Sequence, residues 1–209
     1  MRKYLEGGIE MKQYDAVILG FGKGGKTLAG YLAGEGQQVA VIEKSPEMYG
    51  GTCINVGCIP TKSLVNSAHM AKVKELKTFE EKAGFYRQAI AEKTALVEKL
   101  RQKNYHMLSD KENITVYDGE GSFMNEHEIK IVSQEGTVTI SGEKIFINTG
   151  STPFIPPIEG LQESKFVYLS EGMLDLEELP RELVITAKLS PYRQRQFLKR
   201  MSSGIHMGC

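Results

Sequence analysis

Residues 20–25 of this 209-residue chain read G-F-G-K-G-G and match the spacing G-x-G-x-x-G. An apolar run before them predicts a buried strand over 14–19, and the residues after them predict a helix over 27–34. A second strand is expected over 38–42. This order of strand, glycine-rich turn, helix and strand opens a doubly wound fold. We therefore expect an α/β fold on a mainly parallel sheet, with a dinucleotide at the helix N-terminus.

The glycines of this turn suit a bound pyrophosphate. Gly20 allows the tight turn, Gly22 lets the backbone approach a phosphate, and Gly25 lets helix and strand pack closely. Glu43 stands at the end of the second predicted strand, where a carboxylate can accept hydrogen bonds from ribose hydroxyls. The alternative is a structural glycine-rich turn, and the motif alone does not distinguish FAD from NAD.

Two cysteines follow within residues 50–62, which read G-G-T-C-I-N-V-G-C-I-P-T-K. The C-x₄-C spacing can bring the sulfurs of Cys53 and Cys58 into bonding geometry. Pro60 is placed to open a helix, which would put Cys58 near a helix N-terminus that favours a thiolate, and Lys62 adds positive charge. Redox chemistry is the preferred interpretation. Two buried structural cysteines or half a metal site are the alternatives.

The metal alternative is weak because no second C-x₂-C or nearby Cys/His pair completes a zinc set. No metal site is therefore expected. The histidines are scattered and predicted to be surface or helix residues: His69, His106, His127 and His206. The remaining cysteine, Cys209, is a terminal thiol with no assigned role.

The middle of the chain changes from a helical period to a strand period. Helices are predicted over 63–77 and 86–108. The predicted strands cover 114–117, 128–132, 137–140 and 144–147. We interpret these strands as a small antiparallel β-meander. A proline-rich link at 153–157 then indicates a domain boundary.

Composition narrows the class of protein. Lys and Arg together number 26, as do Asp and Glu, so no general attraction to nucleic acid or membranes is predicted. No apolar run approaches the ~18 residues of a membrane span, and the N-terminus lacks the apolar segment of a signal peptide. Three cysteines do not make a secreted disulfide framework. A cytoplasmic protein without nucleic-acid or membrane partners is expected.

The end of the chain differs from the rest. Residues 183–186 predict the start of another strand, but residues 187–209 carry five basic residues and no acidic one. A solvated basic tail is one interpretation of 187–209. We prefer sequence that never belonged to the fold, as a frameshift would produce.

The cysteine motif closely resembles that of the pyridine nucleotide–disulfide oxidoreductases, which include dihydrolipoamide dehydrogenase, glutathione reductase and mercuric reductase. The resemblance runs from about Met11 to Thr186. Within that family, residues 18–23, 48–51 and 142–150 look most like the RclA-type reactive-chlorine-resistance flavoproteins, which act as hypothiocyanous acid reductases.

The resemblance implies roles for individual residues. Cys53 would be the interchange thiol that attacks substrate, Cys58 the charge-transfer thiolate facing the flavin, and Lys62 a neighbour of the isoalloxazine ring. In such an enzyme, NAD(P)H reduces FAD, which reduces the disulfide, which reduces a small-molecule oxidant or disulfide substrate. The residues implied to bind FAD are Gly20, Gly22, Gly25, Glu43, Gly51, Thr52, Lys62, Gly121, Thr149, Gly150 and Ser151.

The chain also departs from the family pattern. After 183–185 the family continues into a second glycine-rich turn for NAD(P)H, whereas this chain reads T-A-K-L-S-P. The last strand of the FAD domain and the C-terminal interface domain of the homodimeric family are missing. We therefore expect an incomplete fold, an open sheet edge that favours association, and little turnover by this chain alone.

Alternative functions stay open. Dihydrolipoamide dehydrogenase- or mercuric reductase-like activity is the first. A flavin-binding remnant without catalysis is the second, and an NAD-binding domain with incidental cysteines is the third. The predicted parts are an extension over 1–10, an FAD-binding domain with the redox cysteines over 11–152, a link and start of a nicotinamide domain over 153–186, and an aberrant basic tail over 187–209.

Overall fold

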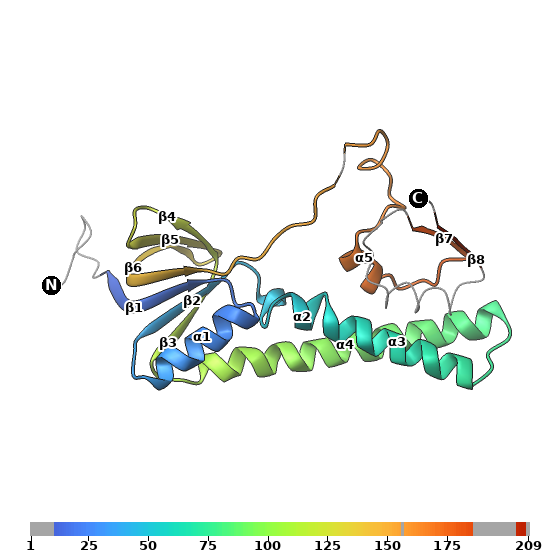
Figure 1. The fold of residues 1–209 in the computed structure, drawn as a ribbon, viewed down its shortest axis with the longest axis horizontal. Coiled ribbons are helices and arrows are strands. Elements are labelled where there is room, and N and C mark those ends of the chain that lie inside the picture. The colour runs from blue at the N-terminus through green and yellow to red at the C-terminus, as the bar shows by residue number, and fades with distance from the viewer. Residues whose placement is uncertain (1–10, 156, 186–203, 208–209) are drawn as a thin grey trace. The chain divides into compact units, whose positions relative to one another are not determined.

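The computed structural model describes residues 11–155 and 157–185, together with the backbone of strand 204–207 (Figure 1). The predicted extension over 1–10 and most of the predicted tail over 187–209 lie outside the described residues. The strands are β1 (Lys12–Leu19), β2 (Val39–Glu43), β3 (Ile114–Asp118), β4 (Glu120–Phe123), β5 (Glu128–Ser133), β6 (Gly136–Ile147), β7 (Glu182–Ile185) and β8 (Gly204–Met207). The helices are α1 (Lys23–Gly34), η1 (Pro46–Met48), α2 (Thr52–Asn55), α3 (Cys58–Val73), α4 (Phe79–Ser109) and α5 (Ser170–Leu174).

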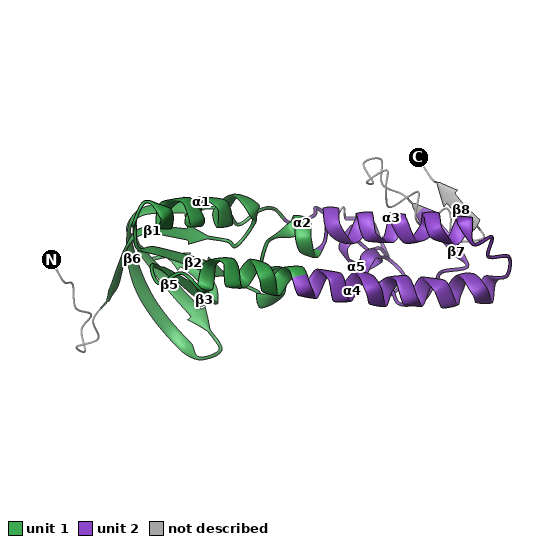
Figure 2. Cartoon of the chain, turned by 90° about the horizontal axis from the view of Figure 1, so that it is seen from below, with its two compact units in different colours: residues 1–55, 100–151 green, residues 56–99, 152–209 purple. Residues whose placement is uncertain are grey.

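The chain forms two compact units, shown in different colours in Figure 2. Unit 1 comprises residues 1–55 and 100–151, and unit 2 comprises residues 56–99 and 152–209. Helix α4 contributes its first part to unit 2 and its last part to unit 1.

Unit 1 is built on a six-stranded sheet with the order β3-β2-β1-β6-β5-β4. The first four strands run parallel, and β5 and β4 continue from β6 in antiparallel pairs. This arrangement confirms the predicted α/β fold with a mainly parallel sheet and a small antiparallel meander. The register places Leu19 opposite both Ile42 and Ile147, so β1, β2 and β6 end at one edge of the sheet.

Both faces of the parallel strands are apolar because β1 and β2 are nearly continuous runs of Ala, Val, Ile and Leu. On one face, Ala16 and Ile18 pack with Ala29 of α1 and Leu108 of α4. On the other face, residues of β5 and β6 pack over β1 and β2. Figure 1 shows α1 and the meander on opposite sides of this sheet.

Strand β6 corrects one sequence-based expectation. Residues 137–140 and 144–147 were predicted as two strands, but Gly136–Ile147 is a single strand of 12 residues. Its first half pairs with β5 and its second half with β1, so the change of partner falls near Gly142. A Cβ at Gly142 would lie 2.7 Å from Cγ2 of Val17. The glycine therefore permits close packing and does not mark a turn.

The helix boundaries also differ from the predicted ones. Helix α3 begins at Cys58 rather than at 63, so Pro60 lies in its first turn as the sequence suggested. Helix α4 begins at Phe79 rather than 86. Strand β4 was not predicted, because its four residues include Gly121 and carry little apolar pattern.

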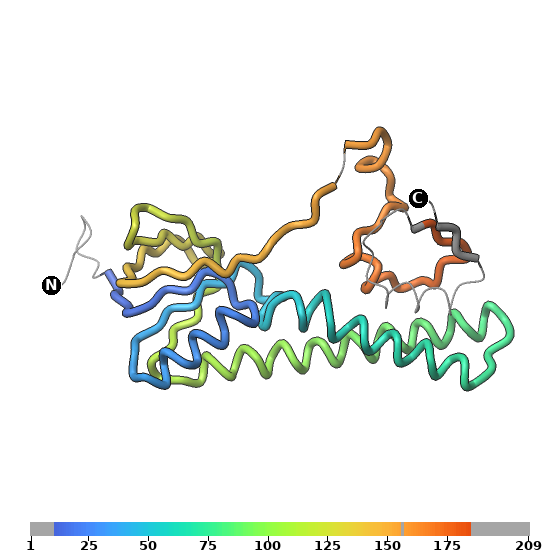
Figure 3. The backbone as a smooth tube through the Cα atoms, in the orientation of Figure 1, coloured from blue at the N-terminus to red at the C-terminus, as the bar shows by residue number. Residues whose placement is uncertain are grey.

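Unit 2 has its own apolar core between α3, the first part of α4, and the segment around α5. Leu64, Tyr86 and Leu174 belong to this core. The hydroxyl of Tyr86 donates to the carbonyl oxygen of Leu176 at 2.8 Å, and Lys93 pairs with Asp175 at 2.5 Å. The described residues of 152–169 form only turns and irregular chain, as the tube in Figure 3 shows.

In the same unit, β7 pairs in parallel with β8. The strand predicted to start at 183 is thus present as Glu182–Ile185. Within the described ranges, no helix has the length and apolar character needed to cross a membrane.

Candidate functional site

The glycine-rich turn joins the end of β1 to the start of α1. Its first residue, Gly20, has φ of +104°, a conformation that L side chains rarely adopt. The Gly20 N–H donates to the carbonyl oxygen of Ile42 at 2.8 Å. A Cβ at Gly20 would lie 2.3 Å from the backbone oxygen of Asn148. Both the backbone angle and the crowding therefore require glycine here.

Gly22 and Gly25 are both crowded by the side chain of Asn148, and Gly25 is crowded by backbone as well. Gly22 is the N-cap residue of α1, and a Cβ there would lie 2.9 Å from Nδ2 of Asn148. A Cβ at Gly25 would lie 2.5 Å from the backbone oxygen of Gly20 and 2.9 Å from Cγ2 of Ile18. Gly25 thus sets the close approach of α1 to β1, whereas Gly22 faces a side chain.

The N-terminus of α1 is suited to an anion. Among the described residues, no side chain caps it, and its first turn contains Lys23, Gly24, Gly25 and Lys26 without an acid. The first N–H groups of a helix have no intrahelical acceptor and lie at the positive end of its dipole. These donors fit a pyrophosphate, which is the part of FAD that the motif predicts to bind here.

Glu43 connects the turn to the end of β2. One of its carboxylate oxygens accepts from the N–H of Phe21 at 2.8 Å, and the other accepts from the N–H of Ser45 at 3.2 Å. An ionised carboxylate has about four acceptor positions, so two are left for further donors such as ribose hydroxyls. Glu43 therefore has a structural role in the turn that the sequence did not indicate.

Asn148, which follows β6, holds the turn from the other side and was not identified from the sequence. Its N–H donates to the carbonyl oxygen of Leu19 at 2.8 Å, and its Nδ2 donates to that of Gly20 at 3.2 Å. The available signal was a polar residue directly after a buried parallel strand, at the edge where ligands of such sheets bind.

The cysteine loop starts against this turn. Gly50 and Gly51 have φ of +89° and +74°, and a Cβ at Gly51 would lie 2.6 Å from Cα of Gly22. The backbone of the loop therefore touches the backbone of the glycine-rich turn. Thr52 and Cys53 follow as the first two residues of α2.

The two cysteines belong to different elements. Cys53 is half-buried in α2, while Cys58 is exposed and is the first residue of α3. Both are thiols in this structure. Cys58 thus lies at the N-terminus of a helix, the position that the sequence predicted. Lys62 is exposed one turn further along α3.

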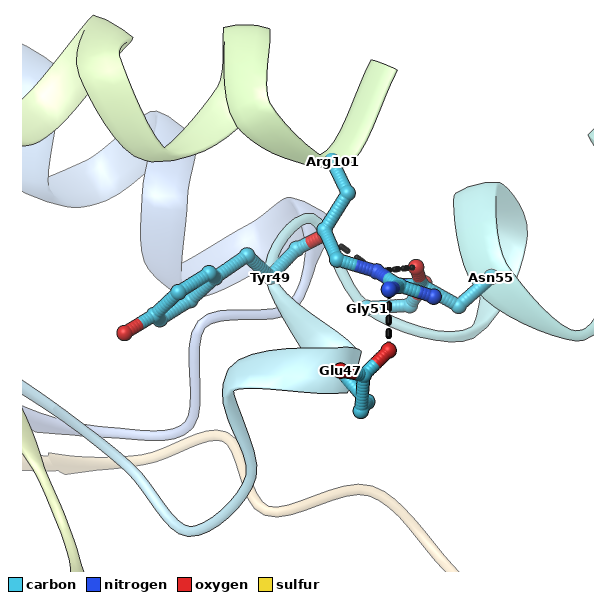
Figure 4. A network of polar contacts seen from close by, with 5 residues as sticks. All are labelled: Glu47, Tyr49, Gly51, Asn55 and Arg101. Carbon is cyan, nitrogen blue, oxygen red and sulfur yellow. Dashed lines mark hydrogen bonds and ion pairs between the residues drawn. The ribbon is translucent and has the colours of Figure 1, made fainter. Parts of the chain in front are cut away.

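A polar network fixes the start of α2, and Figure 4 shows its five residues. The side-chain amide of Asn55 is buried and donates to the carbonyl oxygens of Tyr49 and Gly51, both at 3.0 Å. Arg101 of α4 donates through Nε to Oδ1 of Asn55 at 3.0 Å and pairs through Nη1 with Glu47. Of these five residues, Gly51 alone was among the site residues predicted from the sequence.

Tyr49 holds the segment before the cysteine loop in place. Its ring lies 5.0 Å from that of Phe21 and 4.7 Å from that of Tyr105, measured between centroids. Its hydroxyl donates to a carboxylate oxygen of Asp118. Burial, and then the hydrogen bond to Asp118, raise the pKa of Tyr49 well above its usual range. Tyr49 therefore stays neutral and positions the segment before Gly50.

The remaining predicted FAD residues lie around the same sheet edge or on the meander. Thr149, Gly150 and Ser151 follow β6 and are exposed. Gly121 lies on β4, where a Cβ would meet Cδ2 of Leu19 at 2.9 Å. Close packing against the sheet thus accounts for Gly121 as a glycine, whether or not it touches a cofactor.

The described histidines and acidic residues do not form a second candidate site. His69, His106 and His127 are exposed, as predicted, and His206 lies outside the residues whose side chains are described. Among the described side chains, no group of three or more His, Cys, Asp or Glu is placed to hold a metal ion.

Comparison with known proteins gives consistent matches. Residues 14–186 match the family described as "Pyridine nucleotide-disulphide oxidoreductase". The chain is 50% identical over 175 residues to "Probable pyridine nucleotide-disulfide oxidoreductase RclA" of Escherichia coli (strain K12), which covers 84% of this chain and 37% of that protein. It is 35% identical to a mercuric reductase of Shewanella putrefaciens, over 80% of this chain and 31% of the reductase.

A solved structure matches as well. It is the Cu(II) complex of the HOCl-induced flavoprotein disulfide reductase RclA from Escherichia coli. The TM-score is 0.82 at 44% identity, and the match covers 94% of this chain and 42% of that one. The matches therefore span 31–42% of the length of these three relatives.

Proposed function

Because this chain belongs to the pyridine nucleotide-disulphide oxidoreductase family, we propose that it is the FAD-binding, cysteine-carrying part of a flavoprotein disulfide reductase. One observation carries the proposal. Gly51, two residues before Cys53, lies so close to Gly22 that a Cβ would be 2.6 Å from the Gly22 Cα. The loop with the reactive cysteine therefore begins at the phosphate-binding turn, which is where a flavin dinucleotide would have to reach it.

The ADP part of FAD would bind to unit 1. The N-terminus of α1 would hold the pyrophosphate, with Gly20 and Gly22 allowing its approach. The acceptor positions of Glu43 that its two backbone contacts leave open would receive the ribose hydroxyls. The residues present fit the cofactor because the helix end supplies donors and Glu43 supplies acceptors. Thr52 and residues 149–151 would add further contacts.

The two cysteines would have different roles in the redox reaction. Cys53 would exchange with substrate, Cys58 would face the flavin ring, and Lys62 would lie near that ring. Bound FAD supplies the transfer of two electrons from a reduced nicotinamide to the cysteine pair. The chain would contribute the alignment, because it places Cys58 at the start of α3.

The proposed substrate is a small-molecule oxidant or disulfide, reduced in the cytoplasm. The higher identity to RclA than to mercuric reductase favours RclA-type chemistry over reduction of mercuric ion. NAD(P)H would be the electron donor of the complete enzyme, which we expect to be a homodimer.

A flavin-binding protein without turnover is the second candidate. It is favoured by residues 186–191, which read T-A-K-L-S-P where the family has a second glycine-rich turn. Oxidation of NAD(P)H by the purified chain in the presence of a disulfide distinguishes the two candidates. Turnover supports the reductase, and bound flavin without turnover supports the second candidate.

The visible absorption spectrum tests the proposal itself. The chain is incubated with FAD, separated from excess cofactor and recorded before and after reduction with dithiothreitol. We expect a retained flavin band that changes when the cysteines are reduced, because Cys58 then becomes a thiolate beside the ring.

Cys58→Ser is the matched control, since it should keep the flavin and lose the spectral change. A folded sample that retains no flavin contradicts the proposal. A flavin band that responds equally in the Cys58→Ser variant would place a different residue at the ring.

A further inference from the structure

Lys26 is the last residue of the first turn of α1, and its side chain makes a contact that the phosphate-binding turn does not explain. It is half-buried, and its Nζ donates to Oδ1 of Asn104, near the end of α4. Asn104 is itself 5% exposed, and its Nδ2 donates to the carbonyl oxygen of Leu100 at 2.6 Å. The ammonium group is therefore held in place by a buried amide with a fixed orientation.

This anchor lies directly against the cysteine loop. A Cβ at Gly50 would be 3.2 Å from Cγ of Asn104, and a Cβ at Gly51 would be 3.4 Å from the backbone N of Lys23. The segment that leads into α2 thus passes between the first turn of α1 and Asn104. Cys53 follows Gly51 by two residues, so the Lys26 ammonium and the Cys53 thiol belong to the same small region of unit 1.

The pKa of Lys26 is shifted by its surroundings. Burial first, and then the charge of Lys23, lower the pKa of Lys26, while the charge of Cys53 raises it. The interaction between two charges is mutual, so a cation that is stabilised by a thiolate stabilises that thiolate equally.

Three other charged side chains near the loop have partners. Arg101 of α4 pairs with Glu47 of η1, and the carboxylate of Glu43 accepts two backbone N–H groups. Asp118 of β3 accepts from the Tyr49 hydroxyl. Lys23 lies in the first turn of α1 at the proposed phosphate site. Among the described residues, Lys26 is a cation whose pKa is raised by the charge of Cys53.

We propose that Lys26 is a positioning residue for the redox chemistry, whose ammonium group stabilises the thiolate of Cys53. This inference rests on the proposed function, because it concerns the thiol that would exchange with substrate. The Cys53 thiol gives its proton to water, and the thiolate then supplies the electron pair for a new S–S bond to a disulfide substrate. The leaving sulfur of that substrate departs with the electron pair of the broken bond.

The test uses the full chain with Cys58→Ser and Cys209→Ser, so that Cys53 is its only cysteine. The rate of alkylation by iodoacetamide is measured from pH 5 to pH 10, roughly the range over which protein thiols titrate, and it follows the thiolate fraction. We expect an apparent pKa of Cys53 below the ordinary value of about 8.5. Lys26→Met should raise that pKa by about one unit, as loss of a nearby opposite charge does.

Three variants separate the charge of Lys26 from its packing. Lys26→Arg should restore most of the shift because it keeps the charge. Asn104→Ala should move the pKa in the same direction as Lys26→Met but less, since the ammonium remains without its anchor. Lys103→Met removes an exposed lysine next to Asn104 in the sequence and should leave the profile unchanged.

Identical pH profiles for the parent and Lys26→Met overturn the inference, and so does an equal effect of Lys103→Met. If circular dichroism shows that Lys26→Met does not fold, the pH profiles of Lys26→Arg and Asn104→Ala are compared instead. Identical profiles for these two variants then overturn the inference. Retention of FAD is scored separately. Flavin binding without a Lys26 effect contradicts only this inference, whereas a Lys26 effect without flavin binding contradicts only the proposed function.

Discussion

Helix α1 has glycines near both of its ends, and their surroundings differ. At the N-terminal end, a Cβ on Gly22 or Gly25 would lie 2.5–2.9 Å from atoms of the turn, of β1 or of Asn148. At the C-terminal end, Gly30 and Gly34 have nothing within 4 Å of a Cβ in the described structure, apart from their own helix. The same residue type is thus required at one end and dispensable at the other.

The difference shows what the site demands of the sequence. Glycine in a helix interior costs about 0.5–1 kcal/mol relative to alanine, so it is unfavourable unless something requires it. At Gly22 and Gly25 the requirement is the close approach of the glycine-rich turn to β1 and to Asn148, which follows β6. Site-specific effects should therefore be confined to the N-terminal end.

The largest effect is expected for Gly25→Ala. The added methyl group would lie 2.5 Å from the backbone oxygen of Gly20, which cannot move without opening the turn. We expect the free energy of unfolding to fall by about 3 kcal/mol, at the upper end of the range for overpacking. Urea denaturation measures it, and a loss below about 1 kcal/mol would mean that the turn is more adaptable than the geometry indicates.

A smaller loss is expected for Asn55→Ala in the cysteine loop. Its buried amide donates to the carbonyl oxygens of Tyr49 and Gly51. Removal of the amide takes this donor from the Tyr49 carbonyl, whereas the Gly51 carbonyl still accepts from the backbone N–H groups of Ile54 and Asn55. The expected cost is about 2 kcal/mol in the same assay. Glu47→Gln is the control, because Glu47 is 74% exposed in its ion pair with Arg101 and such pairs contribute less than about 1 kcal/mol. Equal losses for the two variants would contradict this assignment.

A double-mutant cycle sharpens the distinction between Gly22 and Gly25. The closest atom to a Cβ at Gly22 is Nδ2 of Asn148, the end of a side chain. A Cβ at Gly25 would meet the same Nδ2 at 2.9 Å, but its closest atom is the backbone oxygen of Gly20 at 2.5 Å. Asn148→Ala should therefore recover about 1 kcal/mol of the stability that Gly22→Ala loses, and a smaller part of that lost in Gly25→Ala. Additive losses at Gly22 and Asn148 would show that the methyl group strains the backbone instead.

The smallest effect has the opposite sign. Gly30→Ala places a methyl group in open space within the helix, so it should stabilise the chain by about 0.5–1 kcal/mol. A rise of a few degrees in the midpoint of thermal unfolding would be the readout. Destabilisation by Gly30→Ala would remove the contrast between the two ends of α1.

The sequence predicted the local elements well where one period dominates. The apolar runs of β1 and β2 and the glycine spacing before α1 indicated their positions within a few residues. The division of residues 136–147 into two strands was wrong because Gly142 resembles a turn residue. Its actual requirement, close packing on Val17, depends on a strand more than 100 residues earlier in the chain.

The residues that support the site could not be predicted from the sequence, because their contacts also join residues far apart in the chain. Asn148 and Gly20 are 128 positions apart, and Arg101 meets its partners Glu47 and Asn55 from a different element. Neither residue carries a local pattern that reveals such a contact. The glycines and cysteines were identifiable because their spacing is itself the chemical requirement.

The most direct test of the central claim is FAD binding by two variants that differ only at Gly22. Asn148→Ala alone and Asn148→Ala with Gly22→Ala are titrated with FAD, and its fluorescence gives each dissociation constant. Because the Asn148 side chain is absent from both, the crowding of the turn is removed and only the approach of the phosphates differs. We predict about tenfold weaker binding for the double variant, the loss of one charged hydrogen bond. Equal dissociation constants would contradict a phosphate site at Gly22.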